Sequence, residues 1–102
     1  MKKYDQVFDG LDIDLEYPCL KGDIACGPKI TPSDNDRGHF TEFMRLFNKA
    51  MPPGKLLTIA TTSVASKIDA LDLKAIDPFI DSYNIMSYDF TSGSWGEKTT
   101  GH

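Results

Sequence analysis

The chain has 102 residues, of which 40% are hydrophobic and 25% charged, as is usual for one soluble globular domain. Its net charge is −4, with 11 basic and 15 acidic residues and no basic run, so we expect no nucleic-acid partner. No apolar stretch reaches the roughly 20 residues that cross a bilayer, and the opening MKKYDQVFDG lacks the apolar centre of a signal peptide. We therefore expect no membrane partner and no targeting segment in this chain.

The first predicted element is a strand over residues 7–16, VFDGLDIDLE. After Gly10, apolar and acidic residues alternate strictly. The apolar ones are Leu11, Ile13 and Leu15, and the acidic ones are Asp12, Asp14 and Glu16. A period of two places the three carboxylates side by side on one face of the strand. The aliphatic side chains are expected to pack against helices on the opposite face.

A long connection follows, YPCLKGDIACGPKITPSDNDRG, whose glycines and prolines predict no regular element. It contains Cys19 and Cys26. A local disulfide and two free thiols are both open, because pairing depends on a redox compartment that the sequence does not reveal. His39 is distant and His102 is terminal, so the cysteines lack the further ligands of a zinc site. We predict no metal.

An amphipathic helix is predicted over residues 36–51, and PPG at 52–54 ends it. Phe40, Phe43 and Phe47 recur at helical spacing within it. That spacing predicts that all three belong to the hydrophobic core.

The second half of the chain predicts three more elements. KLLTIAT at 55–61 is typical of a short buried strand, and a weaker helical pattern covers 66–77, where Pro78 ends it. A third strand is predicted over 81–90, with a polar loop after it. Strands that alternate with helices predict right-handed crossovers and a parallel sheet. The fold class is therefore α/β, with three parallel strands.

Polar residues occupy one face of both outer strands in this arrangement. The third strand places Asn84, Met86 and Tyr88 on one face, and the first strand presents its carboxylates. A strand of a parallel sheet is normally covered on both faces, so this polarity needs an explanation. One interpretation is a half-solvated edge strand. Calcium binding is disfavoured, because neither DGLDIDLE nor SDNDRGHF has the D-x-D-x-D-G spacing of a calcium loop.

Catalysis is the alternative interpretation of the carboxylates. Same-face neighbours on a strand lie about 6 to 7 Å apart, and repulsion at that distance favours a proton on one of them. A protonated carboxyl beside a carboxylate suits general acid catalysis at a glycosidic oxygen. Glu16 lies at the C-terminal end of its strand, where parallel α/β proteins build their active sites.

DGLDIDLE, from Asp9 to Glu16, matches the D-G-x-D-x-D-x-E signature of family 18 glycoside hydrolases, the chitinase family. MSYD, from Met86 to Asp89, resembles the family's M-x-Y-D motif, and GSWGEKTTGH resembles the loop after it. The resemblance covers essentially the whole chain. It implies that residues 1–102 are a fragment of the catalytic domain. That fragment would be a partial TIM (β/α)8 barrel with about strands 4 to 6 and the intervening helices.

The resemblance also implies an activity, which is hydrolysis of chitin or chitin oligosaccharides, β-1,4-linked N-acetylglucosamine, with retention of configuration. In this family the acetamido oxygen of the substrate is the nucleophile. Glu16 would be the acid and then the base. Asp14 would bind the acetamido N–H and move between Asp12 and Glu16, while Asp12 would share a proton with Asp14. Tyr88 would hold the acetamido group for attack.

Further residues are implied as substrate contacts, and they are Met86, Asp89, Tyr17 and Trp95. For Trp95 an ordinary loop aromatic is the alternative. No cofactor is implied. Five of the eight barrel strands are missing, so we expect the isolated chain to be inactive. The full-length family member is expected to be secreted.

Two other functions stay open within the family. One is a non-hydrolytic chitin- or oligosaccharide-binding lectin of the same fold, which the presence of Glu16 disfavours. The other is an endo-β-N-acetylglucosaminidase, which would use the same signature.

Overall fold

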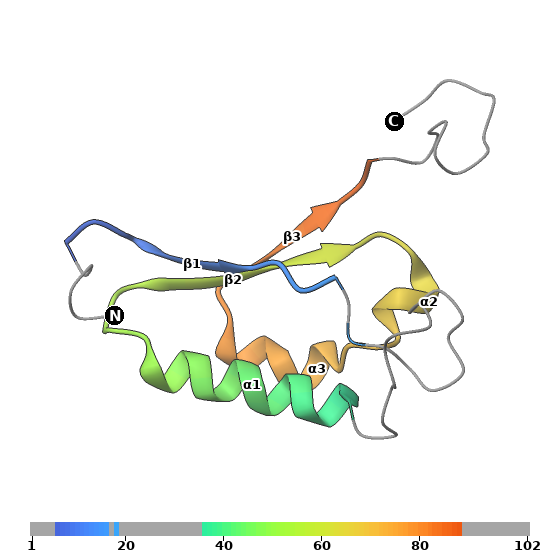
Figure 1. Ribbon diagram of the computed structural model, residues 1–102, viewed down its shortest axis with the longest axis horizontal. Coiled ribbons are helices and arrows are strands. Elements are labelled where there is room, and N and C mark those ends of the chain that lie inside the picture. Colours follow the sequence, from blue (N-terminus) through green and yellow to red (C-terminus); the bar gives the residue numbers. More distant parts are fainter. Residues whose placement is uncertain (1–5, 17, 19–35, 89–102) are drawn as a thin grey trace.

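Three parallel strands form one sheet in the order β1-β2-β3 (Figure 1). The computed structural model describes residues 6–16, 18 and 36–88. The strands are β1 (Gly10–Ile13), β2 (Leu56–Thr62) and β3 (Ser82–Met86). The parallel α/β architecture predicted from the sequence is thus confirmed.

Helices connect the strands and lie on one side of the sheet (Figure 1). Helix α1 (Asp36–Ala50) precedes β2, as predicted, whereas α2 (Ala65–Ile68), α3 (Leu73–Ile76) and the 3-10 turn η3 (Asp77–Phe79) join β2 to β3. No helix among the described residues is long and apolar enough to span a membrane.

The single helix predicted over 66–77 is wrong, because the structure divides it between α2 and α3. Asp72 lies at the break. Its Oδ1 accepts a hydrogen bond of 3.2 Å from the backbone N–H of Ala75, which caps a new helix. An aspartate between two short apolar patterns therefore starts a helix here instead of continuing one.

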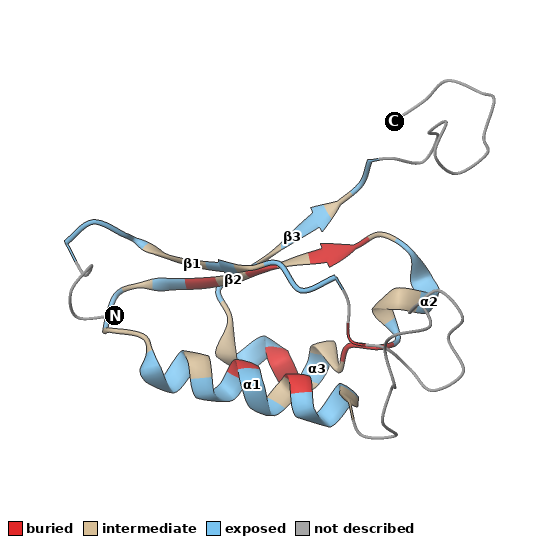
Figure 2. Cartoon of the chain, viewed as in Figure 1, coloured by how far each residue is buried: buried red, intermediate tan, exposed pale blue. Residues whose placement is uncertain are grey.

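The hydrophobic core lies between β2 and the helices (Figure 2). Its buried members are Phe40, Met44, Leu57, Ile59, Leu71 and Ile76. Leu11 and Ile13 of β1 pack against this cluster as predicted. Leu15 follows β1 and is 49% exposed, so its predicted packing against helices is incomplete.

Phe43 corrects the predicted helix core, because its side chain is 41% exposed. Met44 is fully buried instead, and Phe47 packs at the margin of the core. Successive residues are rotated by about 100° around a helix axis. The buried face is centred on Phe40 and Met44, which leaves Phe43 on the flank, with its ring 4.6 Å from the ring of Phe47.

Strands β1 and β3 end earlier than the alternation predicts. Pairing of β1 with β2 ends at the pair Ile13 and Ile59, and β3 ends at Met86. The Ser87 N–H donates to the Ile85 carbonyl at 3.1 Å, and this tight turn ends the third strand. The predicted bounds of 7–16 and 81–90 are therefore too long.

Gly10 is required by the close approach of β1 to β2. A Cβ atom at this position would collide with the backbone carbonyl of Leu56. Leu56 also donates its N–H to the Asp9 carbonyl at 2.9 Å, which begins the pairing of the two strands. The glycine of DGLDIDLE thus sets the position of β1, and with it the positions of the acidic residues that follow.

Candidate active site

A hydrogen-bonded cluster crosses the sheet on the face opposite the helices. Thr58 Oγ1 donates to Asp12 Oδ1 at 2.5 Å, and Asn84 Nδ2 donates to the same oxygen at 3.0 Å. Asn84 Nδ2 also lies 3.5 Å from Thr58 Oγ1. One carboxylate oxygen therefore joins side chains from all three strands.

Strand register explains this cluster. Asp12 is paired with Thr58, and Ala60 with Asn84. Residues of the same parity on adjacent strands share a face, so these four side chains point to the same side. The short side chain of Ala60 leaves space for the Asn84 amide to reach across β2 to Asp12.

Asp14, Glu16 and Tyr88 lie just beyond the C-terminal ends of their strands. All three are exposed, and Tyr88 is 56% exposed. Because β1 and β3 are parallel, these residues lie at the same end of the sheet, where the strands have their C-termini. Within the described ranges, the three side chains form no hydrogen bond or ion pair with one another or with other groups.

Met86 is the last residue of β3 and is half-buried. It shares the parity of Asn84, so it belongs to the same face as Asp12. Its carbonyl accepts a hydrogen bond of 3.2 Å from Ser63 Oγ, which ties the end of β3 to the segment after β2. Met86 therefore lies on the polar face at the C-terminal end of its strand, and its contact with substrate stays a prediction.

Five predicted residues lie outside the described residues, and they are Tyr17, Cys19, Cys26, Asp89 and Trp95. The roles of Tyr17, Asp89 and Trp95 stay predictions, and a disulfide and two free thiols both stay open for Cys19 and Cys26. Among the residues that are described, no group of three or more His, Cys, Asp or Glu side chains could hold a metal ion.

Thr58 belongs to the cluster, but its sequence pattern does not predict this. Its strand, LLTIATT, is predicted as buried because it is rich in aliphatic side chains, and nothing local separates one threonine from another. The distinguishing signal is the register with β1, which places Thr58 and not Thr61 beside Asp12. The alternation of β3 predicts the face of Asn84 correctly but does not predict its partner, Asp12.

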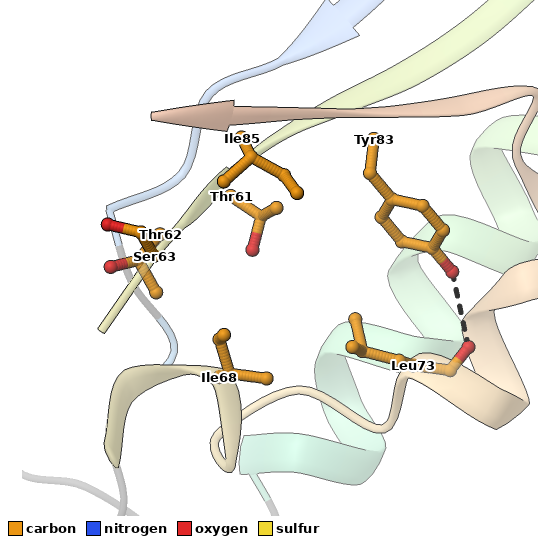
Figure 3. A pocket seen from close by; sticks show the side chains of 7 residues that line it. All are labelled: Thr61, Thr62, Ser63, Ile68, Leu73, Tyr83 and Ile85. Carbon is orange, nitrogen blue, oxygen red and sulfur yellow. Dashed lines mark hydrogen bonds between the residues drawn. The ribbon is translucent and has the colours of Figure 1, made fainter. Parts of the chain in front are cut away.

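A cavity of about 400 Å³ lies on the other face of the sheet, on the side of the helices (Figure 3). Its lining is mainly apolar and consists of Thr61, Thr62, Ser63, Ile68, Leu73, Tyr83 and Ile85. Thr61 and Tyr83 have the parity opposite to Asp12, so the cavity is separate from the carboxylates. The buried Thr61 Oγ1 forms no hydrogen bond within the described part of the chain.

Tyr83 of β3 lines this cavity, and its pKa is shifted by its surroundings. Its hydroxyl lies 3.3 Å from both the Leu73 carbonyl oxygen and Asp77 Oδ1. Burial raises the pKa of Tyr83, and the negative charge and hydrogen bond of Asp77 raise it further. The neutral phenol is thereby favoured in the folded protein.

Comparison with known proteins gives a consistent result. The sequence profile described as glycosyl hydrolases family 18 matches residues 1–102. Chitinase 63 of Streptomyces plicatus is 35% identical over 99 residues, which cover 94% of this chain and 15% of that protein. The chain thus spans a small part of the relative that it matches.

Solved structures agree with the sequence comparison. The cell-surface-expressed, multi-modular chitinase ChiW of Paenibacillus sp. str. FPU-7 superposes with a TM-score of 0.76 at 28% identity, over 100% of this chain and 12% of that one. A variant of the Group II chitinase catalytic domain 2 of Ostrinia furnacalis, in complex with penta-N-acetylchitooctaose, gives 0.73 at 31% identity, over 99% and 26%.

Proposed function

The chain belongs to glycosyl hydrolases family 18, and we propose that its residues 1–102 are the part of a catalytic (β/α)8 barrel that carries the acid/base Glu16. The described sheet is a three-stranded part of such a barrel, as its likeness to chitinase domains indicates. The observation that carries the proposal is the anchored motif. Asp12 is fixed on the polar face by donors from β2 and β3, and Asp14 and Glu16 follow it at the C-terminal edge.

The proposed reaction begins at the glycosidic oxygen. Glu16 gives its proton to that oxygen as the C1–O bond breaks, and the acetamido carbonyl oxygen of the substrate forms a bond to C1. Asp14 accepts the acetamido N–H hydrogen bond and stabilises the positive charge of the resulting oxazolinium. The Tyr88 hydroxyl donates to the acetamido oxygen and orients it.

Water completes the reaction. The Glu16 carboxylate takes a proton from the water as the water oxygen attacks C1, and the bond from C1 to the acetamido oxygen breaks. Two displacements at C1 give retention of configuration. Glu16 ends the cycle protonated, as it began, so no cofactor is needed.

Chitin or an N-acetylglucosamine oligosaccharide is the proposed substrate. The support is the chitin oligomer bound to the Ostrinia furnacalis domain, whose matched segment is 31% identical. Met86 on the polar face is a proposed contact, with Asp89, Tyr17 and Trp95 proposed beside it. We also propose action outside the cell, which the cell-surface-expressed relative supports.

The isolated 102-residue chain is proposed to lack turnover. A barrel of this kind uses eight strands to form its groove, and the described sheet has three. Its two outer strands each have one edge without a partner strand among the described residues. The chain alone therefore contains the DGLDIDLE motif but forms only part of a substrate groove.

A chitin oligomer tests this function. We would incubate the natural protein that contains residues 1–102, at its full natural length, with the hexamer of N-acetylglucosamine and follow the products by NMR. Shorter oligomers whose new reducing ends form first as β-anomers are expected. New ends that form first as α-anomers would contradict the mechanism. Binding without any cleavage would favour a lectin instead.

A further inference from the structure

We propose that Thr58 and Asn84 are positioning residues for hydrolysis, because together they occupy Oδ1 of Asp12 and leave only Oδ2 for Asp14. This inference rests on the proposed function. It assigns a role to two side chains that lie outside both the D-G-x-D-x-D-x-E motif and the M-x-Y-D motif. Neither residue is proposed to touch the sugar.

Lone-pair geometry is the first step. A carboxylate oxygen has two lone pairs, and Oδ1 of Asp12 accepts from a hydroxyl at 2.5 Å and from an amide at 3.0 Å. Both lone pairs are then used, so Oδ1 has no room for a proton of its own. A proton shared between Asp12 and Asp14 must lie on the side of Oδ2.

The donors also fix the rotation of the carboxylate. They approach from two different strands, and Asn84 lies near Thr58 as well, so the cluster closes on itself. With Oδ1 held towards β2 and β3, Oδ2 is turned away from them. Asp14 follows in the chain on the same parity as Asp12, and Oδ2 is the oxygen left to meet it.

Rigid elements carry both donors. Thr58 lies between Leu57 and Ile59, which are each 1% exposed and anchor β2 in the core. Asn84 follows Tyr83, whose hydroxyl is held at the Leu73 carbonyl. Side chains on anchored strands hold a partner more accurately than side chains on loops.

The expected consequence is on turnover and not on binding. The family resemblance implies that Asp14 turns from Asp12 to Glu16 during the reaction, and Asp12 must then keep its place to receive Asp14 again. If the Asp12 carboxylate rotated freely, it would adopt several orientations, and only some of them would present Oδ2 to Asp14. Small misplacements of reacting groups can cost about a hundredfold in rate. Because neither Thr58 nor Asn84 is proposed to contact the sugar, the affinity for the sugar should change little.

The test uses the natural protein at its full length and the hexamer of N-acetylglucosamine. Thr58→Val and Asn84→Leu remove one donor each while keeping side-chain size, and Thr58→Ser restores the hydroxyl. Thr61→Val is the matched control, because it removes a hydroxyl from the same strand on the opposite face, where Oγ1 forms no hydrogen bond among the described residues. Glu16→Gln reports the proposed function itself. Thermal unfolding checks each variant for folding.

We expect Thr58→Val and Asn84→Leu to lower kcat between about tenfold and about a hundredfold, with KM within twofold. Thr58→Ser should recover most of kcat, and Thr61→Val should equal the wild type. If both donor variants keep kcat within twofold while Glu16→Gln loses activity, the positioning role is wrong and the proposed function stands. The positioning role is also wrong if Thr58→Ser is as slow as Thr58→Val. It is wrong as well if the loss of kcat in each variant is fully explained by a smaller folded fraction in thermal unfolding. Equal rates for the wild type and Glu16→Gln, including none in either, overturn the proposed function and this inference with it.

Discussion

The Asn84 amide donates a hydrogen bond of 3.0 Å to Oδ1 of Asp12, although the two residues lie 72 positions apart in the sequence and on the two outer strands of the sheet. The bond passes over β2, where Thr58 donates to the same oxygen. Asp12 of the DGLDIDLE motif is thus fixed by β3, the strand that leads into the MSYD motif. The two motifs are therefore connected through the sheet by side-chain hydrogen bonds.

Gly10→Ala should destabilise the protein, because an added Cβ collides with the Leu56 carbonyl, a backbone group that cannot rotate away. We expect a loss of about 1 to 3 kcal/mol in the free energy of unfolding, measured by urea denaturation of the natural protein. Gly54→Ala is the control. Its φ of 81° strains alanine, but nothing lies within 4 Å of the new atom, so the loss should be smaller. A Gly10→Ala protein as stable as the wild type would contradict the close approach of the two strands.

Asp81→Ala should also destabilise the protein, through the backbone of β2. Asp81 Oδ2 accepts a hydrogen bond of 2.8 Å from the N–H of the buried Leu57, and alanine would leave that N–H unpaired. The expected loss is about 1 to 3 kcal/mol. Asp81→Asn keeps a side-chain oxygen and should lose less. Equal stabilities of the wild type and Asp81→Ala in urea would show that the contact contributes nothing.

Tyr83 should make stability depend on alkaline pH. Its pKa in the folded protein is raised above the usual 10.0, chiefly by burial, so the folded state keeps the phenol proton to a higher pH than the unfolded chain. The stabilisation is fully present below the unfolded pKa and is lost as the pH rises through the folded one. Tyr83→Phe has no proton to lose. The urea midpoint of the wild type should therefore fall more than that of Tyr83→Phe between about pH 8 and about pH 11. Parallel curves for the two proteins would rule out this linkage.

Much of the fold follows from local sequence patterns. The alternation of Leu11 and Ile13 with acidic residues predicts the first strand and its two faces, and the spacing of Phe40 and Phe47 predicts α1. These patterns work because burial of one face imposes its period on the sequence. The parallel sheet follows from the order of the elements alone.

Other features depend on contacts between distant segments. Thr58 is recognisable only when the register of β1 and β2 is known, since the same strand contains Thr61 on the opposite face. The alternation predicts an end of the first strand that is too late, because it continues to Glu16 after pairing has ended at Ile13. Asp72 fits a helical surface as well as a helix cap, so the local sequence does not predict the break between α2 and α3.

The rate of hydrolysis by Glu16→Gln tests the central claim most directly. The variant keeps the size and shape of the side chain but cannot give up a proton to the leaving oxygen or take one from water. Asp9→Asn is the matched control, because it neutralises another carboxylate of the same motif. Asp9 has the parity opposite to Asp12, and its backbone carbonyl accepts a hydrogen bond from the Leu56 N–H. Both would be assayed in the natural protein at full length with the hexamer of N-acetylglucosamine. We predict that Glu16→Gln lowers kcat by about a hundredfold or more while Asp9→Asn stays within tenfold of the wild type. Wild-type turnover in Glu16→Gln would contradict the account.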